Sequence, residues 1–579
     1  MPVRQVGTSV SVLDAADIEA RGYSSVADVL RTQPAIGVSN SGGQGKATAL
    51  RIRGEEGYRT LVLMDGVEIS DPTGTQVGPQ IQHLMSAGIS RIEILRGPQG
   101  MMYGADAGGV INITTGQVDE GLAGGFTAET GRYGTEQYSG YLGAGNELGD
   151  VYISVSDYQT DGFSALKSDA SKDEDGYDNE TYHVKVGLNL NEQWRLQGVY
   201  RDVSSISLFD STSGSNNRKS NYDEKTYRVS LNYSGEVFSH TLAVANTDVL
   251  RENFADGVSS FATNGDIDKL EYLGSAKLSE VLSLVYGAES ETEEITTSSG
   301  DVEQRDQLSG YLELQSQFDN RLFFTAGVRH DDNDDFGEHT SYRLTSAYVV
   351  DFADGSMLKY KASYGTGFRA PSLSEIAYNN GPFAFAPASE TTLTEETSEG
   401  FDVGIEYVTA DNSRIELVYF DQEIKDELYF DLSGFSGYLQ AEGISRSKGV
   451  EASLDSPITD RLNLFANYTY NDSHNPDGEN RIRRPVHLAN LGVNYDIIPS
   501  RWSVTMNVRA SRDAENEIFG VGYVELDDYE VIDISTNFQV TDYAEVYARV
   551  ENATDEDYEE VTGYNVAGAA AYAGVRMKF

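Results

Sequence analysis

Apolar and polar residues alternate one by one along most of the chain after about residue 121. Clear examples are the segments 322–328, 461–470, 501–510 and 571–579, where apolar side chains occupy every second position. Such alternation predicts β-strands with one apolar and one polar face. Segments of about ten residues have the length that a tilted strand needs to cross a bilayer.

A closed transmembrane β-barrel explains this pattern better than a soluble β-sandwich or propeller, whose strands would also alternate. The alternation recurs through 121–579, aromatic residues stand at the ends of the apolar faces, and the intervening loops are long and acidic. No run approaches the ~18 apolar residues of a spanning helix, which excludes a helical membrane protein. Because every backbone amide needs a partner in hydrocarbon, we expect the strands to close into a barrel.

The first part of the chain has a different pattern, in which short β-type runs flank glycine-rich turns. Two such units are 51–67 (RIRGEEGYRTLVLMDGV) and 91–115 (RIEILRGPQGMMYGADAGGVINITT). They predict a small α+β domain over residues 1–118, followed by the barrel over 119–579. Since a large barrel has an open lumen, we expect the small domain to plug it.

Composition narrows the classes of function. The net charge of −49 makes nucleic acid an improbable partner, because binding phosphates needs a basic surface. The absence of cysteine removes disulfides, thiolate metal sites and cysteine nucleophiles. The 58 glycines and 36 tyrosines agree with many turns and with aromatic girdles at membrane interfaces.

Motifs for catalysis are weak. Residues 40–47 (NSGGQGKA) lack the first glycine and the Ser/Thr of a phosphate-binding loop, and 143–149 (GAGNELG) has the wrong spacing for a dinucleotide site. No two histidines have the spacing of a zinc site. We therefore expect no enzyme activity, no catalytic residue and no catalytic cofactor.

An ordered series of motifs resembles the TonB-dependent outer-membrane receptors. The plug motifs are 52–54 (IRG), 63–67 (LMDGV), 94–97 (ILRG) and 108–113 (GGVINI), and the barrel motifs are 364–372 (YGTGFRAPS), 446–451 (RSKGVE) and 550–558 (VENATDEDY). The terminal Phe579 is similar to the assembly signal of outer-membrane barrels. The resemblance therefore spans nearly the whole chain.

This resemblance implies a 22-stranded antiparallel transmembrane β-barrel with the plug inside, which actively takes up a scarce bulky solute. It implies a monomer in the outer membrane of a Gram-negative bacterium. The implied partners are the TonB energy-transducing complex at the plug's periplasmic face, outer-membrane lipid and lipopolysaccharide, the barrel-assembly machinery and a small-molecule substrate. Four charged residues match the family's latch between plug and barrel: Arg53, Arg96, Glu396 and Glu451.

The chain departs from the family at its beginning, where no signal peptide or TonB box precedes Pro2. We expect the true start to lie upstream of Met1. A porin or adhesin that is not energised is the alternative if this beginning is complete.

Within the family, the segments 39–53, 71–78 and 558–568 resemble the cobalamin transporters. The resemblance implies these substrate-binding residues: Ser39, Asn40, Gln44, Lys46, Asp71, Thr73, Thr75 and Gln76. A ferric-siderophore receptor is the alternative. Haem uptake is less favoured, because no histidine lies between His339 and His474. His83 is the remaining hint of haem, and a lone histidine is more often structural.

Those transporters hold calcium in early extracellular loops, and acidic residues occupy the corresponding places here. The implied ligands are Asp169, Asp173, Asp175, Asp210 and Asn216, the last of which stands where a carboxylate is expected. Calcium prefers several carboxylate and carbonyl oxygens, which alternate aspartates can supply. In so acidic a chain, an ordinary solvated loop is the other interpretation.

Overall fold

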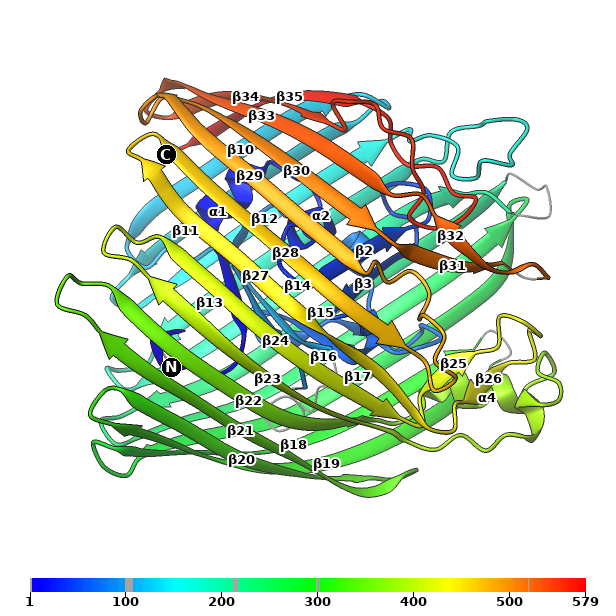
Figure 1. Cartoon of the computed structure of the whole chain (residues 1–579), viewed down its shortest axis with the longest axis horizontal. Coiled ribbons are helices and arrows are strands. Elements are labelled where there is room, and N and C mark those ends of the chain that lie inside the picture. Colours follow the sequence, from blue (N-terminus) through cyan, green and yellow to red (C-terminus); the bar gives the residue numbers. More distant parts are fainter. Residues whose placement is uncertain (1–2, 99–107, 212–216, 298–299, 301, 519) are drawn as a thin grey trace.

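A computed structural model describes residues 3–98, 108–211, 217–297, 300, 302–518 and 520–579. Within this part of the chain, 22 antiparallel strands form a closed barrel, and each pairs with its neighbours in sequence order (Figure 1). The last strand, β35, pairs with the first, β10, and so closes the ring. The predicted 22-stranded antiparallel barrel with an N-terminal plug is confirmed.

The barrel strands have the following bounds: β10 (Gly121–Gly131), β11 (Glu136–Asn146), β12 (Gly149–Thr160), β13 (Tyr177–Asn189), β14 (Trp194–Phe209), β15 (Arg218–Ser234), β16 (Phe238–Ala255), β17 (Val258–Lys277), β18 (Leu282–Thr297), β19 (Val302–Phe318), β20 (Leu322–Asn333), β21 (Gly337–Asp351), β22 (Met357–Arg369), β23 (Glu396–Val408), β24 (Arg414–Lys425), β27 (Ile444–Thr459), β28 (Leu462–His474), β29 (His487–Ile498), β30 (Trp502–Arg512), β33 (Tyr529–Thr541), β34 (Ala544–Glu551) and β35 (Ala570–Lys578).

In the barrel wall, apolar side chains are exposed and polar side chains are buried, which is the reverse of a soluble protein. In β24, Ile415 and Leu417 are 49% and 48% exposed, whereas Glu416 between them is 6% exposed. Apolar side chains therefore face outwards to lipid, and polar side chains face the lumen, as the period-two pattern requires.

The two ends of the barrel differ. At one end lie short turns and both chain termini, and at the other lie long connections with structure of their own (Figure 1). These connections carry α4 (Leu373–Asn380), η4 (Ala388–Glu390), the hairpin β25 (Leu428–Phe430) with β26 (Tyr438–Gln440), and the hairpin β31 (Ala514–Ile518) with β32 (Gly522–Leu526). Since outer-membrane barrels have short periplasmic turns, the long-loop end is the extracellular one.

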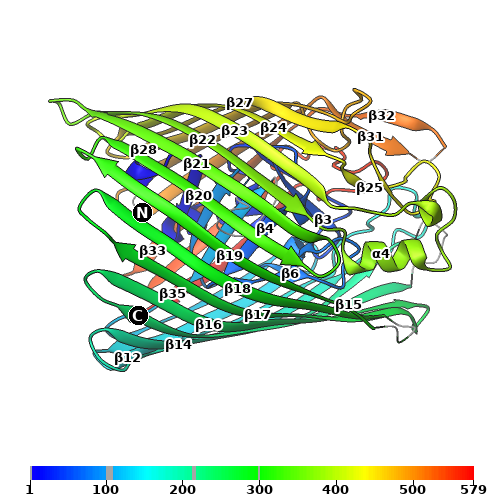
Figure 2. The ribbon, with the colours of Figure 1, turned by 90° about the horizontal axis from the view of Figure 1, so that it is seen from below.

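The plug is a mixed five-stranded sheet inside the barrel, with strand order β1-β8-β9-β4-β5 (Figure 2). Its strands are β1 (Val10–Asp14), β4 (Thr60–Met64), β5 (Val67–Glu68), β8 (Ile89–Arg96) and β9 (Gly109–Thr115). Its other elements are η1 (Val3–Gln5), α1 (Ala15–Arg21), α2 (Val26–Leu30), β2 (Ile36–Asn40), β3 (Thr48–Ile52), η2 (Gly57–Arg59), β6 (Ser70–Asp71), β7 (Gly78–Pro79) and η3 (Ile81–His83).

A compact apolar core holds the plug together. The two β-type runs of the 91–115 unit pair directly, with Ile94 opposite Ile111 and Ile92 opposite Ile113, and all four side chains are buried. The turn region at 99–107 lies outside the described residues. The expected domain boundary after residue 118 falls in the connection between β9 and β10. None of the helices in the described ranges has the length and apolar content needed to cross a membrane.

Candidate functional site

Buried ion pairs join the plug to the barrel wall. Arg53 follows β3 in a tight turn, where it and Gly54 both have positive φ (54° and 80°). Its Nε lies 2.6 Å from Glu451 Oε1, and the Nε of Arg96, the last residue of β8, lies 3.0 Å from Glu451 Oε2. One wall glutamate in β27 therefore receives both of the expected plug arginines.

Glu396, the fourth expected latch residue, has a different partner. Arg59 at the end of η2 binds it with two hydrogen bonds of 2.7 and 2.9 Å. Arg369 of β22 donates a third hydrogen bond of 2.9 Å. Sequence reasoning did not select Arg59, although it lies in the same glycine-rich unit as Arg53.

A second charged network surrounds the outer edge of the plug. Glu55 accepts two hydrogen bonds of 2.9 and 3.0 Å from Arg481, and Glu56 lies 3.0 Å from Arg484. Burial alone would raise the pKa of Glu56, but the Arg51 and Arg484 guanidinium groups lower it to about 2. Glu56 is therefore ionised at neutral pH and attracts the loop before β29 to the plug.

A cavity of about 1350 Å³ opens above the plug at the extracellular end, and we call it the vestibule. The plug supplies the β2–β3 hairpin and residues 74–82, and the walls come from the loops around β25–β26, 475–484 and β31–β32. Among the expected substrate-binding residues, Ser39, Thr75 and Gln76 line it. Its size and its mixture of tyrosines, amides and charges suit a bulky polar solute.

Two expected substrate residues shape the β2–β3 turn and do not line the vestibule. Asn40 accepts a 2.6 Å hydrogen bond from the Gly43 backbone N–H, and its amide donates to the Gly43 carbonyl at 2.8 Å. Gln44 donates to Asp28 within the plug at 3.4 Å. Both line a smaller cavity of about 140 Å³ between plug and wall.

Lys46 is buried at the junction between this turn and the barrel. Its Nζ donates to the backbone carbonyls of Asp175 and Gly176, at 3.0 and 3.2 Å. Burial lowers its pKa to about 8. Lys46 thus anchors the plug hairpin to the loop between β12 and β13.

Asp71 and Thr73 are likewise engaged in structure. The Asp71 carboxylate pairs with Arg251 of β16 and accepts hydrogen bonds from the backbone N–H and the hydroxyl of Thr73. Both residues are buried and absent from the vestibule lining. A short motif cannot reveal which of its polar side chains close the turn itself and which face a cavity.

The acidic loop residues gather at one place. Oxygens of Asp169, Asp173 and Asp210 lie within 4.8 Å of one another, and Asp210 Oδ1 is buried with no hydrogen-bond partner among the residues that the structure describes. Three converging carboxylates, one with an unsatisfied buried oxygen, fit a hard divalent cation such as calcium.

Asp175 lies beside this cluster but has another role. Its carboxylate accepts a 2.7 Å hydrogen bond from the Ala165 backbone N–H. Burial and the neighbouring Asp210 raise its pKa to about 6. Asn216, the fifth expected ligand, lies outside the described residues.

His83 is packed as a structural residue. Its ring stacks on Tyr222 with centroids 4.4 Å apart, and its Nδ1 lies 3.0 Å from the Tyr177 hydroxyl. Burial, with the charges of Arg251 and Arg201, lowers its pKa to about 3, so the imidazole is neutral.

Comparisons with known proteins cover the whole chain. Residues 2–111 match the TonB-dependent Receptor Plug Domain, and residues 115–553 match the TonB dependent receptor-like beta-barrel. The chain is 28% identical over 593 residues to a "Vitamin B12 transporter BtuB" of Photobacterium profundum, covering 100% of this chain and 94% of that protein.

Two siderophore receptors are among the solved structures with the same fold. A mutant of the ferric enterobactin receptor of Pseudomonas aeruginosa, in complex with enterobactin, matches with a TM-score of 0.83, 17% identity and 100% of both chains. The siderophore receptor PirA of Acinetobacter baumannii matches with a TM-score of 0.82, 16% identity and coverage of 99% and 98%. At this identity they establish the fold alone.

Proposed function

The chain belongs to the TonB-dependent receptors, which are outer-membrane transporters, and from this premise we propose that it imports cobalamin or a related corrinoid. The observation that carries this proposal is the similarity along the full chain to a vitamin B12 transporter. The siderophore receptors of similar fold do not oppose it, because they share only 15–20% of their residues with this chain.

The vestibule supports a large cargo with many amide groups, such as a corrinoid. Its plug floor presents three glutamines, Gln76, Gln80 and Gln82, whose amides both donate and accept hydrogen bonds. Tyr58 and Tyr523 add aromatic surface with polar tips. Together they offer neutral hydrogen bonding around an apolar body.

An anionic ferric siderophore is the second candidate, since Arg251, Arg481, Arg483 and Arg484 line the same cavity. Three of these arginines already pair with plug carboxylates, namely Asp71, Glu55 and Glu56. Arg483 donates to the amide oxygen of Asn516 and, within the described residues, has no carboxylate partner. Most of the positive charge is therefore neutralised before any cargo arrives.

Binding to purified protein tests the cargo. We expect cyanocobalamin to bind and a ferric catecholate siderophore to bind weakly or not at all. Gln80→Ala should weaken cobalamin binding by about tenfold, the equivalent of one to two lost hydrogen bonds. The matched control is Gln307→Ala, on the wall away from the vestibule. Siderophore binding without cobalamin binding would reject the proposal.

We also propose that Asp169, Asp173 and Asp210 hold calcium. The ion would offset most of the repulsion among the three carboxylates and so order the loop 161–176 against the plug hairpin that Lys46 anchors. Its role would be to position this loop beside the cargo site, because calcium supplies charge and rigid coordination rather than chemistry.

A loop variant separates this role from general loop damage. Asp169→Ala with Asp173→Ala should abolish calcium binding, measured by calorimetry, and weaken cobalamin binding by about tenfold, the scale of ordering a few side chains. Glu174→Ala, in the same loop but outside the cluster, is the control. Calcium binding that survives in the double variant would refute the site.

A further inference from the structure

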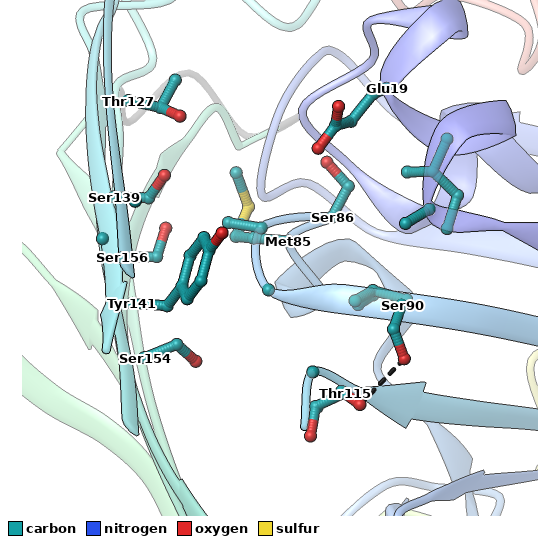
Figure 3. Close-up of a pocket in the computed structure, with 18 of the residues that line it drawn as sticks. Glu19, Met85, Ser86, Ser90, Thr115, Thr127, Ser139, Tyr141, Ser154 and Ser156 are labelled. Atoms are coloured by element: carbon teal, nitrogen blue, oxygen red, sulfur yellow. Dashed lines mark hydrogen bonds between the residues drawn. The ribbon is translucent and has the colours of Figure 1, made fainter. Parts of the chain in front are cut away.

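A second cavity of about 400 Å³, which we call the lower cavity, lies between the plug and the barrel wall (Figure 3). Its lining includes Lys578 at the end of β35, so it lies towards the periplasmic end of the barrel. One side is the plug, with Glu19, Met85, Ser86 and Ser90, and the other is the wall of β10, β11 and β12. The wall residues here include four small hydroxyl side chains: Thr127, Ser139, Ser154 and Ser156. Hydroxyl groups both donate and accept hydrogen bonds, so this part of the surface can exchange them with a passing polar solute.

Ion pairs bind the plug to several parts of the barrel wall but, among the described residues, not to β10–β12. Buried or half-buried ion pairs join it to β13, β17, β23 and β27 through these contacts: Asp65–Lys185, Glu68–Lys269, Arg59–Glu396 and Arg53–Glu451. Between the plug residues that the structure describes and strands β10–β12, no hydrogen bond or ion pair is present. Glu129 of β10, a buried acid that lines the lower cavity, is bound by Arg549 of β34 instead.

One plug segment separates the lower cavity from the vestibule, and we call residues 80–88 the gate segment. Gln80 and Gln82 at its start line the vestibule, whereas Met85 and Gly88 near its end line the lower cavity. Residues of this one short segment therefore line both cavities.

The barrier at the gate segment is apolar and neutral. Met85 packs with the buried rings of Tyr158 and Tyr177 from β12 and β13. His83 Nδ1 lies 3.0 Å from the Tyr177 hydroxyl, and the Asn179 amide donates to the His83 carbonyl at 3.3 Å. Separating these neutral groups leaves no buried charge without a partner. Separating one of the ion pairs to β13, β17, β23 or β27 would leave a buried charge unpaired.

We propose that the cargo leaves the barrel between the plug and strands β10–β12, through the gate segment and the lower cavity. This proposal rests on the transport function above. The lower cavity is smaller than the vestibule, so the plug must move away from this wall for the cargo to pass. Among the residues described, no hydrogen bond or ion pair joins the plug to β10–β12, and the gate segment is joined to β13 and β14 through hydrogen bonds between neutral groups. Movement of the plug away from this wall therefore leaves no buried charge unpaired.

A reversible tether tests the route. A Cβ built on Gly88 would lie 3.4 Å from the Ser154 Cβ, close to the separation of about 3.5–4.5 Å in a disulfide. The chain has no cysteine, so Gly88→Cys with Ser154→Cys gives one defined cross-link. The matched control is Gly22→Cys with Ser535→Cys, which spans 3.9 Å to β33 and has the same positive φ at its glycine (75° against 77°).

Cargo binding and TonB-driven uptake are measured in the oxidised and reduced states. We expect the oxidised Gly88–Ser154 pair to bind cargo and lose uptake, and reduction to restore it, while the control pair takes up cargo in both states. The oxidised and reduced forms carry the same substitution at position 88 and therefore the same backbone strain. The difference in uptake between them is then due to the cross-link alone. Continued uptake in the oxidised state, or equal loss in the control pair, would overturn the route.

A second measurement needs neither cargo nor TonB. Met85→Ala with Tyr177→Ala removes the barrier between the cavities, so the variant should conduct ions in planar bilayers where the unsubstituted protein does not. The control, Leu428→Ala with Tyr438→Ala, removes an equally buried cluster in the β25–β26 hairpin outside the lumen and should stay closed. If the protein does not bind cobalamin, the proposed cargo is rejected but the route is not. If the Met85→Ala, Tyr177→Ala variant conducts no more than the unsubstituted protein, the route is rejected.

Discussion

Single arginines and glutamates decide how the plug is attached to the barrel. Arg59 is fully buried, and its Nη1 also lies 3.1 Å from Glu427. Removing one member of such a pair leaves the other charge buried without compensation, which is far more damaging than losing a surface pair.

We therefore expect Arg59→Ala to destabilise the docked plug by about 3–5 kcal/mol. Limited proteolysis of the plug and denaturant unfolding of the folded protein measure this change. Arg91→Ala is the control, because Arg91 pairs with Glu93 at the exposed surface and should lose about 1 kcal/mol or less. Equal effects of the two substitutions would contradict the latch.

The Glu56 carboxylate predicts a dependence on pH. Its pKa in the folded state is about 2, below its ordinary value of 4.5, so its stabilising effect is present above pH 4.5 and is lost as the pH falls towards 2. Calorimetry between these values should show the plug transition weakening, and Glu56→Gln should reduce this slope. An unaltered slope in the variant would contradict the assignment.

At the level of elements, the β2–β3 hairpin depends on one glycine. Gly45 has φ 71°, and a Cβ added there would overlap the ring of Tyr177. Gly45→Ala should displace the hairpin and weaken cargo binding, measured by titration, by about tenfold or more. Gly257→Ala also places alanine at positive φ (77°) but meets no neighbour within 4 Å, so it should leave binding unchanged. Loss of binding in both variants would show that backbone strain, and not overlap with Tyr177, is the cause.

The alternating sequence pattern predicts the position of the barrel strands but not their ends. The segments 501–510 and 571–579 coincide with β30 and β35 within a few residues, because alternation is enforced where one face meets lipid. Other strands are much longer than a bilayer requires, such as β17 with 20 residues. Beyond the membrane the outer face no longer needs to be apolar, while backbone pairing continues, so the sequence pattern does not mark the ends.

At the scale of the molecule, barrel closure does not use the plug. β35 pairs with β10 from Gly125 to Gly131, so all 22 strands find their partners within the barrel itself. A chain lacking residues 1–118 should fold, insert into planar bilayers and form a permanently open channel. Circular dichroism and conductance check this, with the full-length protein as the control. A deletion variant that fails to form β-structure would show that the plug is needed for closure.

The sequence alone determined the class of molecule, a transmembrane barrel with a glycine-rich plug, because both properties follow from local period and composition. It also marked Arg53, Arg96 and Glu451 as latch residues, although only through resemblance. The tertiary structure alone decided that Glu396 is held by Arg59, 337 positions away, and that Ser39, Thr75 and Gln76 face the vestibule while Asn40, Lys46 and Asp71 do not. Such choices depend on strand register and ring closure, which bring together residues whose local sequences carry no information about one another.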